Sequence, residues 1–246
     1  MSVSAVVIAL NEEVNIAPCL QTLSFADEIV VIDGGSADKT YDLARSFTEK
    51  VYQRNFDDFS SQKNFAIEKA SSEWIFSVDA DERVSRALVD EIKRLINQHS
   101  DCAAYAIQRK TRLFGRLFQC SGLQADRPVR FFKKGRAHFE RPVHEILKVD
   151  GQIGLLKETL EHVSFQTFRE YLRRLQLYTS LETAGARKNS KPHFFARPFY
   201  RFFTLYVIKQ GFRDGIEGFF YCVLSGYYEF IRRAKLWEKT VGRTHG

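Results

Sequence analysis

The sequence predicts an α/β fold, a mostly parallel sheet flanked by helices, followed by a helical C-terminal extension. Short apolar runs alternate with segments of helical periodicity in the first hundred residues, which is typical of a parallel sheet covered by helices. Polar and acidic residues directly follow three of these runs. Beyond residue 162 the pattern becomes helical, aromatic and basic, which predicts the extension.

The apolar run at 3–10 predicts a strand buried on both faces, because a strand between two helical layers has no solvent-exposed side. Further strands are predicted at 28–32, 50–53 and 74–78. The intervening helices are predicted at 12–23, 37–47, 60–70 and 84–97. Ser36 is the expected N-cap of the second helix, whereas Pro18 is an unfavourable residue inside the first.

Residues 101–162 change character, with strand-like segments at 103–108, 129–132 and 146–149 and a basic loop at 109–127. After them, helical i, i+3, i+4, i+7 spacing recurs in two aromatic stripes. The stripes are Phe199, Phe202, Phe203, Tyr206 and Ile216, Phe219, Phe220, Val223. We therefore expect an α/β domain at 1–165, with halves at 1–100 and 101–165, and a helical extension at 166–246.

The composition is that of an ordinary globular protein, with 44% hydrophobic and 27% charged residues among 246. A wholly disordered or low-complexity chain is thereby excluded. The four cysteines form no CxxC pair, so zinc sites and dithiol redox sites are not expected. Free cysteines of this kind are expected of a protein in a reducing compartment. No secretory signal is expected, and no apolar stretch reaches the roughly 18 residues that span a bilayer.

Charge is unevenly distributed, with a net charge of −2 over residues 1–162 and +9 over residues 163–246. A basic tail favours an anionic partner such as lipid, lipopolysaccharide or nucleic acid, although it also serves solubility. No nucleic-acid-binding module is recognisable, so nucleic acid is not expected. The aromatic tail has two open interpretations: helices packed on the domain or on a second subunit, or an anchor at a membrane surface.

Polar clusters follow three predicted strands: Asn-Glu-Glu at 11–13, Asp-Gly-Gly at 33–35 and Asp-Ala-Asp at 79–81. Ligands of open parallel sheets bind at the carboxyl ends of the strands. We therefore expect the three clusters to meet at one edge of the sheet. This expectation depends on topology and on no single motif.

The two carboxylates of Asp79 and Asp81 form a DxD motif after a buried strand. Mg²⁺ and Mn²⁺ prefer oxygen ligands and commonly bridge carboxylates to substrate phosphates, so the motif indicates a divalent-metal site. A solvated turn capping the next helix is the alternative. Asp33 with its two glycines allows close backbone approach to a base or ribose, but neither GxGxxG nor a P-loop is present.

Four motifs over residues 3–83, in their order and spacing, resemble glycosyltransferase family 2 with the GT-A fold. They are Asn-Glu-Glu at 11–13, Asp-Gly-Gly-Ser at 33–36, Gln-Lys-Asn-Phe-Ala at 62–66 and Asp-Ala-Asp-Glu at 79–82. The segments at 127–132, 142–145, 161–165, 211–220 and 235–238 are similar to the branch that includes bacterial lipopolysaccharide core β-glucosyltransferases. The resemblance implies that residues 1–100 bind a nucleotide sugar and residues 101–165 the acceptor.

The resemblance also implies roles for individual residues. Those beside the nucleotide or its diphosphate are Asn11, Glu13, Asp33, Lys63 and Asp79. The metal ligands are Asp79, Asp81 and His162, with Asp81 as the direct ligand. Two alternatives remain open: a solvated surface lysine at 63 and a strand-end histidine at 162. Arg127 and Arg130 are expected to bind donor or acceptor phosphates bidentately, as guanidinium groups do, or are ordinary strand-edge charges.

Glu145 falls where the family has its general base, and a carboxylate there would take the proton of the acceptor hydroxyl. The family pattern is an acidic pair, but here the pair is His144-Glu145. Which of these two residues acts as the base is therefore left open.

The expected protein is a metal-dependent inverting glycosyltransferase that carries glucose from UDP-glucose to an inner-core sugar of lipopolysaccharide. Its cofactor would be Mg²⁺ or Mn²⁺. It would act in the cytoplasm, peripherally at the anionic inner membrane, on a lipid-linked glycan. The alternatives are a non-catalytic nucleotide-sugar or membrane-surface binding protein of the same fold, and a nucleotidyltransferase.

Overall fold

The computed structural model describes residues 1–98, 101–141, 145–184 and 196–241. The chain forms two compact units. Unit 1 comprises Met1–Lys110 and Asp126–Val163, and unit 2 comprises Thr111–Ala125 and Ser164–Gly246. The stretch at 111–125, assigned from sequence to the acceptor half, thus groups with the C-terminal helices.

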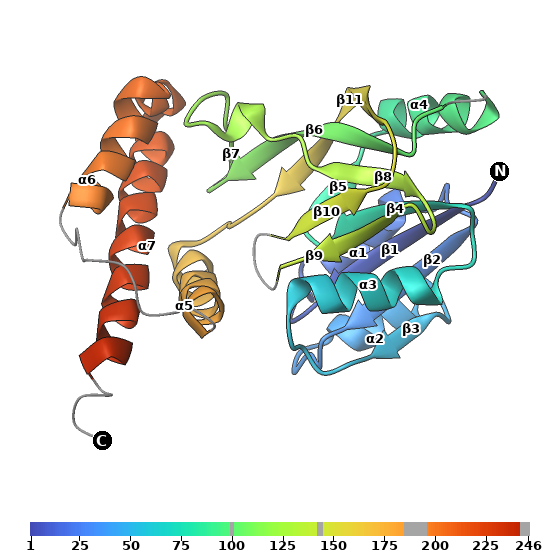
Figure 1. Cartoon of the computed structure of the whole chain (residues 1–246), viewed down its shortest axis with the longest axis horizontal. Coiled ribbons are helices and arrows are strands. Elements are labelled where there is room, and N and C mark those ends of the chain that lie inside the picture. Colours follow the sequence, from blue (N-terminus) through green and yellow to red (C-terminus); the bar gives the residue numbers. More distant parts are fainter. Residues whose placement is uncertain (99–100, 142–144, 185–195, 242–246) are drawn as a thin grey trace. The chain divides into compact units, whose positions relative to one another are not determined.

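Unit 1 contains a large mixed sheet (Figure 1). Its parallel part has the order β3 (Val51–Gln53), β2 (Glu28–Asp33), β1 (Val3–Ala9) and β4 (Trp74–Asp79). The sheet continues through β8 (Val129–Lys133), β6 (Ala104–Leu113), β11 (Ile153–Val163) and β5 (Glu82–Val84), with β8 antiparallel to β4 and β5 antiparallel to β11. The predicted α/β fold is confirmed.

Alternating side chains of β1 enter two separate cores, because successive residues of a strand point to opposite faces. Val3, Ala5 and Val7 pack with α1 (Ile16–Thr22), α2 (Thr40–Arg45) and α4 (Arg86–Asn97). Val6 and Ile8 pack on the other side with α3 (Phe59–Lys69) and the hairpin of β9 (Ala137–Glu140) and β10 (Ile146–Val149). Helices therefore cover both faces of the parallel strands, as the apolar runs predict.

Several boundaries differ from the predicted ones for local reasons. Pro18 lies in the first turn of α1, where its missing N–H has no helical acceptor to lose. The prediction of Ser36 as an N-cap is wrong, because α2 begins only at Thr40 and the Ser36 hydroxyl instead accepts a hydrogen bond from the Asn11 amide. Strands β5, β9 and β11 have polar, weakly alternating sequences that the search for apolar runs did not detect.

Unit 2 is mainly helical. Its elements are β7 (Arg116–Leu117), a 3₁₀ turn η1 (Leu123–Ala125), α5 (Phe168–Ala184), α6 (Ala196–Phe203), the π-helix η2 (Thr204–Ile208), the 3₁₀ turn η3 (Gly211–Asp214) and α7 (Gly215–Val241). Buried Asp214 accepts hydrogen bonds from the backbone amides of Gln119 and Cys120 and from the Ser121 hydroxyl. A Cβ at Gly218 would lie 2.1 Å from the Gly211 carbonyl oxygen, so only glycine fits. Among the described helices, none combines the length and apolarity that crossing a bilayer requires.

Candidate active site

The carboxyl ends of β1, β2 and β4 meet at one edge of the sheet. The parallel register places Asp33 opposite Ala9 and Asp79 opposite Ile8. The loops that follow these strands are therefore neighbours, and the predicted convergence of the three polar clusters is confirmed.

The loops after β1 and β2 are joined by hydrogen bonds. The backbone amide of Asn11 donates to the Ser36 hydroxyl, and the side-chain oxygen of Asn11 accepts from the backbone amide of Ala37, both at 2.9 Å. The Glu13 carboxylate accepts from the Lys39 amide at 3.3 Å. Asp33 is fully buried and accepts from the amides of its own turn, including that of Ser36 at 3.1 Å. These contacts fix the shape of the loop pair, and the nucleotide-binding roles of these residues stay predictions.

Lys63 connects α3 to two acidic groups of the site. Its ammonium group lies 2.9 Å from an Asp79 oxygen and 2.5 Å from a Glu145 oxygen. The ammonium also lies over the Phe139 ring, 5.2 Å from the centroid. The Lys63 side chain is only 2% exposed, so it is not the solvated surface lysine of the alternative interpretation. It holds the DxD motif and the candidate base together.

Arg130 lies on the opposite side of Asp79. Its guanidinium pairs with the Asp79 carboxylate and, at 2.7 Å, with Glu82. Fully buried Glu82 also accepts from the Asp79 amide at 2.9 Å and from Arg109 at 3.2 Å. Arg109 in turn donates to Asp126 at 2.7 Å. Arg130 is therefore a buried ion-pair partner and not a strand-edge surface charge.

These contacts form one continuous series of alternating charges, which we name the ion chain. Its members in order are Asp126, Arg109, Glu82, Arg130, Asp79, Lys63 and Glu145. The sequence analysis assigned no role to Glu82 or Arg109. The available signal was the acidic residue that directly continues the DxD motif, which becomes the first residue of β5.

The ion chain keeps its carboxylates ionised. Burial raises the pKa of Asp79, but attraction to Arg130 and Lys63 outweighs burial and holds the pKa well below its usual range. Burial likewise raises the pKa of Glu145, and Lys63 outweighs it, so that this pKa is also lowered. Burial disfavours the charged form of Arg130, but Asp79 and Glu82 raise the pKa of its guanidinium. Glu145 is therefore unprotonated at neutral pH, as a base must be.

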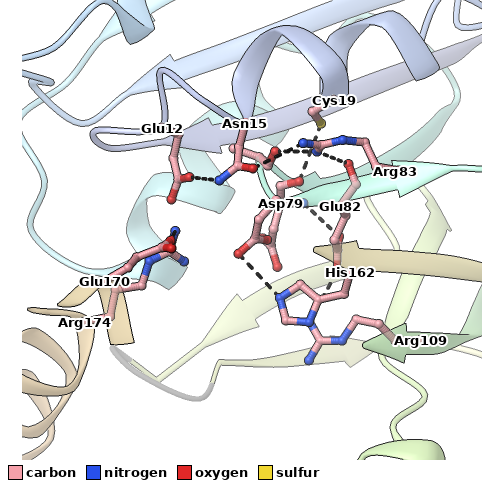
Figure 2. Close-up of polar contacts among 12 residues, drawn as sticks. Glu12, Asn15, Cys19, Asp79, Glu82, Arg83, Arg109, His162, Glu170 and Arg174 are labelled. Atoms are coloured by element: carbon pink, nitrogen blue, oxygen red, sulfur yellow. Dashed lines mark hydrogen bonds and ion pairs between the residues drawn. The ribbon is translucent and has the colours of Figure 1, made fainter. Parts of the chain in front are cut away.

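Asp81 and His162 form a second, smaller group. The pairing of β5 with β11 places His162 opposite Glu82, and the imidazole Nε2 lies 3.4 Å from an Asp81 oxygen. Figure 2 shows His162 beside Glu82 and Arg109, with Asp79 nearby. The Asp81 side chain is only 10% exposed. The structure thus brings together two of the three residues expected to bind metal.

Asp81 and His162 fit a divalent cation that takes its remaining ligands from a diphosphate, since Mg²⁺ commonly binds through one or two side chains plus substrate phosphates. Asp79 fits this role less well, because Lys63 and Arg130 already occupy its two oxygens. Over the described residues, no group of three His, Cys, Asp or Glu side chains is arranged to hold a metal ion.

Arg83, which the sequence analysis also missed, holds the turn that carries the DxD motif. Its guanidinium donates to the carbonyl oxygens of Ala80 at 3.0 Å and Glu82 at 2.9 Å, and to the Asn15 side chain at 3.3 Å (Figure 2). The turn is thus attached to the segment before α1. His144, the second candidate catalytic residue, lies outside the described residues.

Comparison with known proteins gives a consistent result. The family model for "Glycosyl transferase family 2" matches residues 4–163. The lipopolysaccharide core biosynthesis glycosyltransferase LpsC of Rhizobium meliloti is 27% identical, over 97% of this chain and 93% of its own. An uncharacterized glycosyltransferase of Rickettsia felis is 26% identical, over 96% and 89%. The crystal structure of S. aureus TarS 1-349 in complex with UDP-GlcNAc has a TM-score of 0.53 at 17% identity, covering 98% and 92%.

Proposed function

The chain belongs to glycosyl transferase family 2 and is a glycosyltransferase with the GT-A fold, and we propose that it is an inverting hexosyltransferase. In this proposal it transfers the hexose from a UDP-sugar to a lipid-linked glycan. The observation that carries the proposal is the position of Lys63, whose ammonium group holds the DxD residue Asp79 and the carboxylate of Glu145 at one point. A donor diphosphate near Asp79 would therefore lie close to a base.

Glu145 is the proposed general base. About a fifth of its side chain is exposed (20%), so an acceptor hydroxyl can approach it. The acceptor oxygen attacks the anomeric carbon as Glu145 takes the hydroxyl proton. The bond from that carbon to the diphosphate breaks on the opposite face of the sugar, and UDP leaves with the electron pair. Proton transfer of this kind contributes about 10²–10⁴-fold to a rate.

Electrostatics favour a divalent cation in this site. Five carboxylates face four cationic side chains: Asp79, Asp81, Glu82, Asp126 and Glu145 against Lys63, Arg83, Arg109 and Arg130. The site is therefore net negative before an anionic diphosphate enters. Asp81 and His162 would hold the cation, which would supply Lewis-acid stabilisation of the departing diphosphate.

The proposed donor is UDP-glucose, and the proposed acceptor is an inner-core sugar of lipopolysaccharide. The relative LpsC supports this acceptor, since that protein is named for lipopolysaccharide core biosynthesis. Transfer to a lipid-linked acceptor takes place at a membrane surface, and we propose that the protein is peripheral at the cytoplasmic face of the inner membrane. Asn11, Glu13 and Asp33 are proposed to contact the nucleotide.

The test is the Glu145→Gln variant, assayed for release of UDP with a panel of nucleotide sugars and lipopolysaccharide acceptors. We expect transfer to fall by about 10²–10⁴-fold, with binding of the UDP-sugar retained. Glu140→Gln is the matched control, because among the described residues Glu140 pairs with exposed His138 and Lys148 on the same hairpin. Release of pyrophosphate in place of UDP would identify a nucleotidyltransferase, and donor binding without turnover in the wild type would identify a non-catalytic binding protein.

A further inference from the structure

Residues 196–216 of unit 2 expose an unusual number of large apolar side chains. Seven are more than a third exposed: Phe199, Tyr200, Phe203, Val207, Ile208, Phe212 and Ile216. We name them the 199–216 surface. Exposed fractions reach 72% at Phe199 and 60% at Ile216. Isolated exposed apolar residues are ordinary, but a contiguous apolar patch marks an interaction site.

The inner face of the same helical segment is also apolar. Phe202 stacks on Tyr206 with a centroid distance of 5.2 Å, and both rings pack edge-on against Phe219 of α7. Leu205 is buried with only 5% exposed. The aromatic stripe seen in the sequence is therefore divided, with Phe202 and Tyr206 facing α7 and Phe199 and Phe203 facing outward. The segment therefore presents apolar side chains both to α7 and to solvent, with exposed Arg197 and Arg201 on the same helix.

The exposed charges within residues 196–216 have one sign. Arg197, Arg201, Lys209 and Arg213 are all exposed. Asp214, the sole acidic residue between 196 and 216, is buried with 1% exposed and hydrogen-bonded within unit 2. Exposed aromatic and aliphatic side chains bordered by arginine and lysine are the features of a surface that lies at the headgroup level of an anionic bilayer.

We propose that the 199–216 surface docks the protein on a bilayer rich in anionic phospholipid. A second copy of the chain fits less well, because a two-fold interface would bring the same four basic side chains of both copies together. The inference rests on the proposed function only for the biological role of membrane docking, since a lipid-linked acceptor lies at a membrane. Its test needs no substrate.

The experiment is flotation of the full chain with vesicles of phosphatidylcholine alone or with phosphatidylglycerol. We expect binding to the anionic vesicles and about tenfold or greater weakening in Phe203→Ser/Ile208→Ser, because two apolar side chains lose their lipid contact. The matched control is Ile153→Ser/Leu155→Ser in β11, whose side chains are 48% and 54% exposed. That control should bind like the wild type.

A second variant, Arg201→Gln/Arg213→Gln, tests the charge argument and replaces only exposed side chains. Binding to anionic vesicles should weaken by about 25-fold, at roughly fivefold for each of the two charges near the surface, with unchanged binding to neutral vesicles. The proposal is overturned if the wild type does not float with anionic vesicles. It is overturned as well if Phe203→Ser/Ile208→Ser binds as strongly as the control Ile153→Ser/Leu155→Ser. It is also overturned if sedimentation shows a dimer that Phe203→Ser/Ile208→Ser dissociates. Failure of hexose transfer would affect the proposed function alone.

Discussion

Glu82 has neither of its carboxylate oxygens in solvent, and each accepts hydrogen bonds from a different part of unit 1. One oxygen accepts from Arg130 and Arg109, and the other from the backbone amide of Asp79. A buried charge is tolerated only when such partners compensate its loss of hydration. Glu82 therefore orients both Arg130 and the turn of the DxD motif.

Replacing Glu82 by Gln should strongly destabilise the protein, because Arg130 and Arg109 would lose a buried counter-charge. We expect the free energy of unfolding in urea to fall by about 3–5 kcal/mol, together with weaker binding of UDP-sugar. Asp150→Asn is the comparison, since its ion pair with Arg136 is 80% exposed at Asp150 and should contribute about 0–1 kcal/mol. Equal stability of the two variants would contradict the positioning role of Glu82.

Among the elements, β2 is secured at its first residue, Glu28. The Glu28 carboxylate accepts hydrogen bonds from Lys50, from the Ser4 hydroxyl of β1 and, at 2.7 Å, from the Ser71 amide that precedes β4. One side chain thus connects β2 with β1 and with the segments that precede β3 and β4, at the amino end of the sheet and opposite the edge that carries the site. Burial raises the Glu28 pKa, but the hydrogen bonds from Lys50 and Ser4 outweigh burial and lower it to about 2.

This lowered pKa predicts a pH-dependent contribution to stability. Because the folded pKa lies below the ordinary value of 4.5, the contribution is complete above that pH and is lost as the pH falls toward 2. At pH 7, Glu28→Gln should lower the free energy of unfolding by about 2 kcal/mol. Most of this loss comes from the hydrogen bonds with the Ser4 hydroxyl and the Ser71 amide, because the ion pair with Lys50, which is 46% exposed, contributes little. In urea melts from pH 7 to pH 2.5, the gap between wild type and variant should narrow. A constant gap would refute the assignment.

At the scale of the whole molecule, the candidate metal ligands come from distant parts of the chain. Asp81 follows β4, whereas His162 lies near the end of β11, and the antiparallel pairing of β5 with β11 brings them together. A site assembled this way is complete only in the folded chain. Ligands that bind only the folded state raise its apparent stability.

We therefore expect UDP with Mn²⁺ to raise the melting temperature of the wild type, and Mn²⁺ removal by EDTA to abolish most of the shift. Asp81→Asn should retain the melting temperature of the ligand-free wild type within a few degrees but lose the Mn²⁺-dependent increment and the transfer activity. Asp38→Asn at the neighbouring loop pair serves as a control, since among the described residues the Asp38 carboxylate accepts hydrogen bonds from Thr40 and from the Glu13 amide. An Asp81→Asn protein that keeps the full Mn²⁺ shift would exclude Asp81 as a ligand.

The site could be predicted from sequence only in part. The strand ends were predictable, because the apolar runs and the polar residues after them are local patterns, and parallel topology brings such ends together. Resemblance indicates roles for Lys63 and Glu145, but no sequence pattern predicts their direct contact across 82 residues. Glu82 and Arg109 were missed, because a buried ion pair leaves no periodic signal in either segment.

By itself, the sequence determined the α/β fold class, the helical character of the C-terminal region and membership of glycosyl transferase family 2, which depend on local periodicity and on motif order. The tertiary structure alone decided that Asp79 is neutralised by Lys63 and Arg130 while Asp81 lies beside His162. It alone decided which half of the aromatic stripe faces outward. The physical reason is that strand register and helix packing fix which side chains meet, and both arise from contacts between segments far apart in the chain.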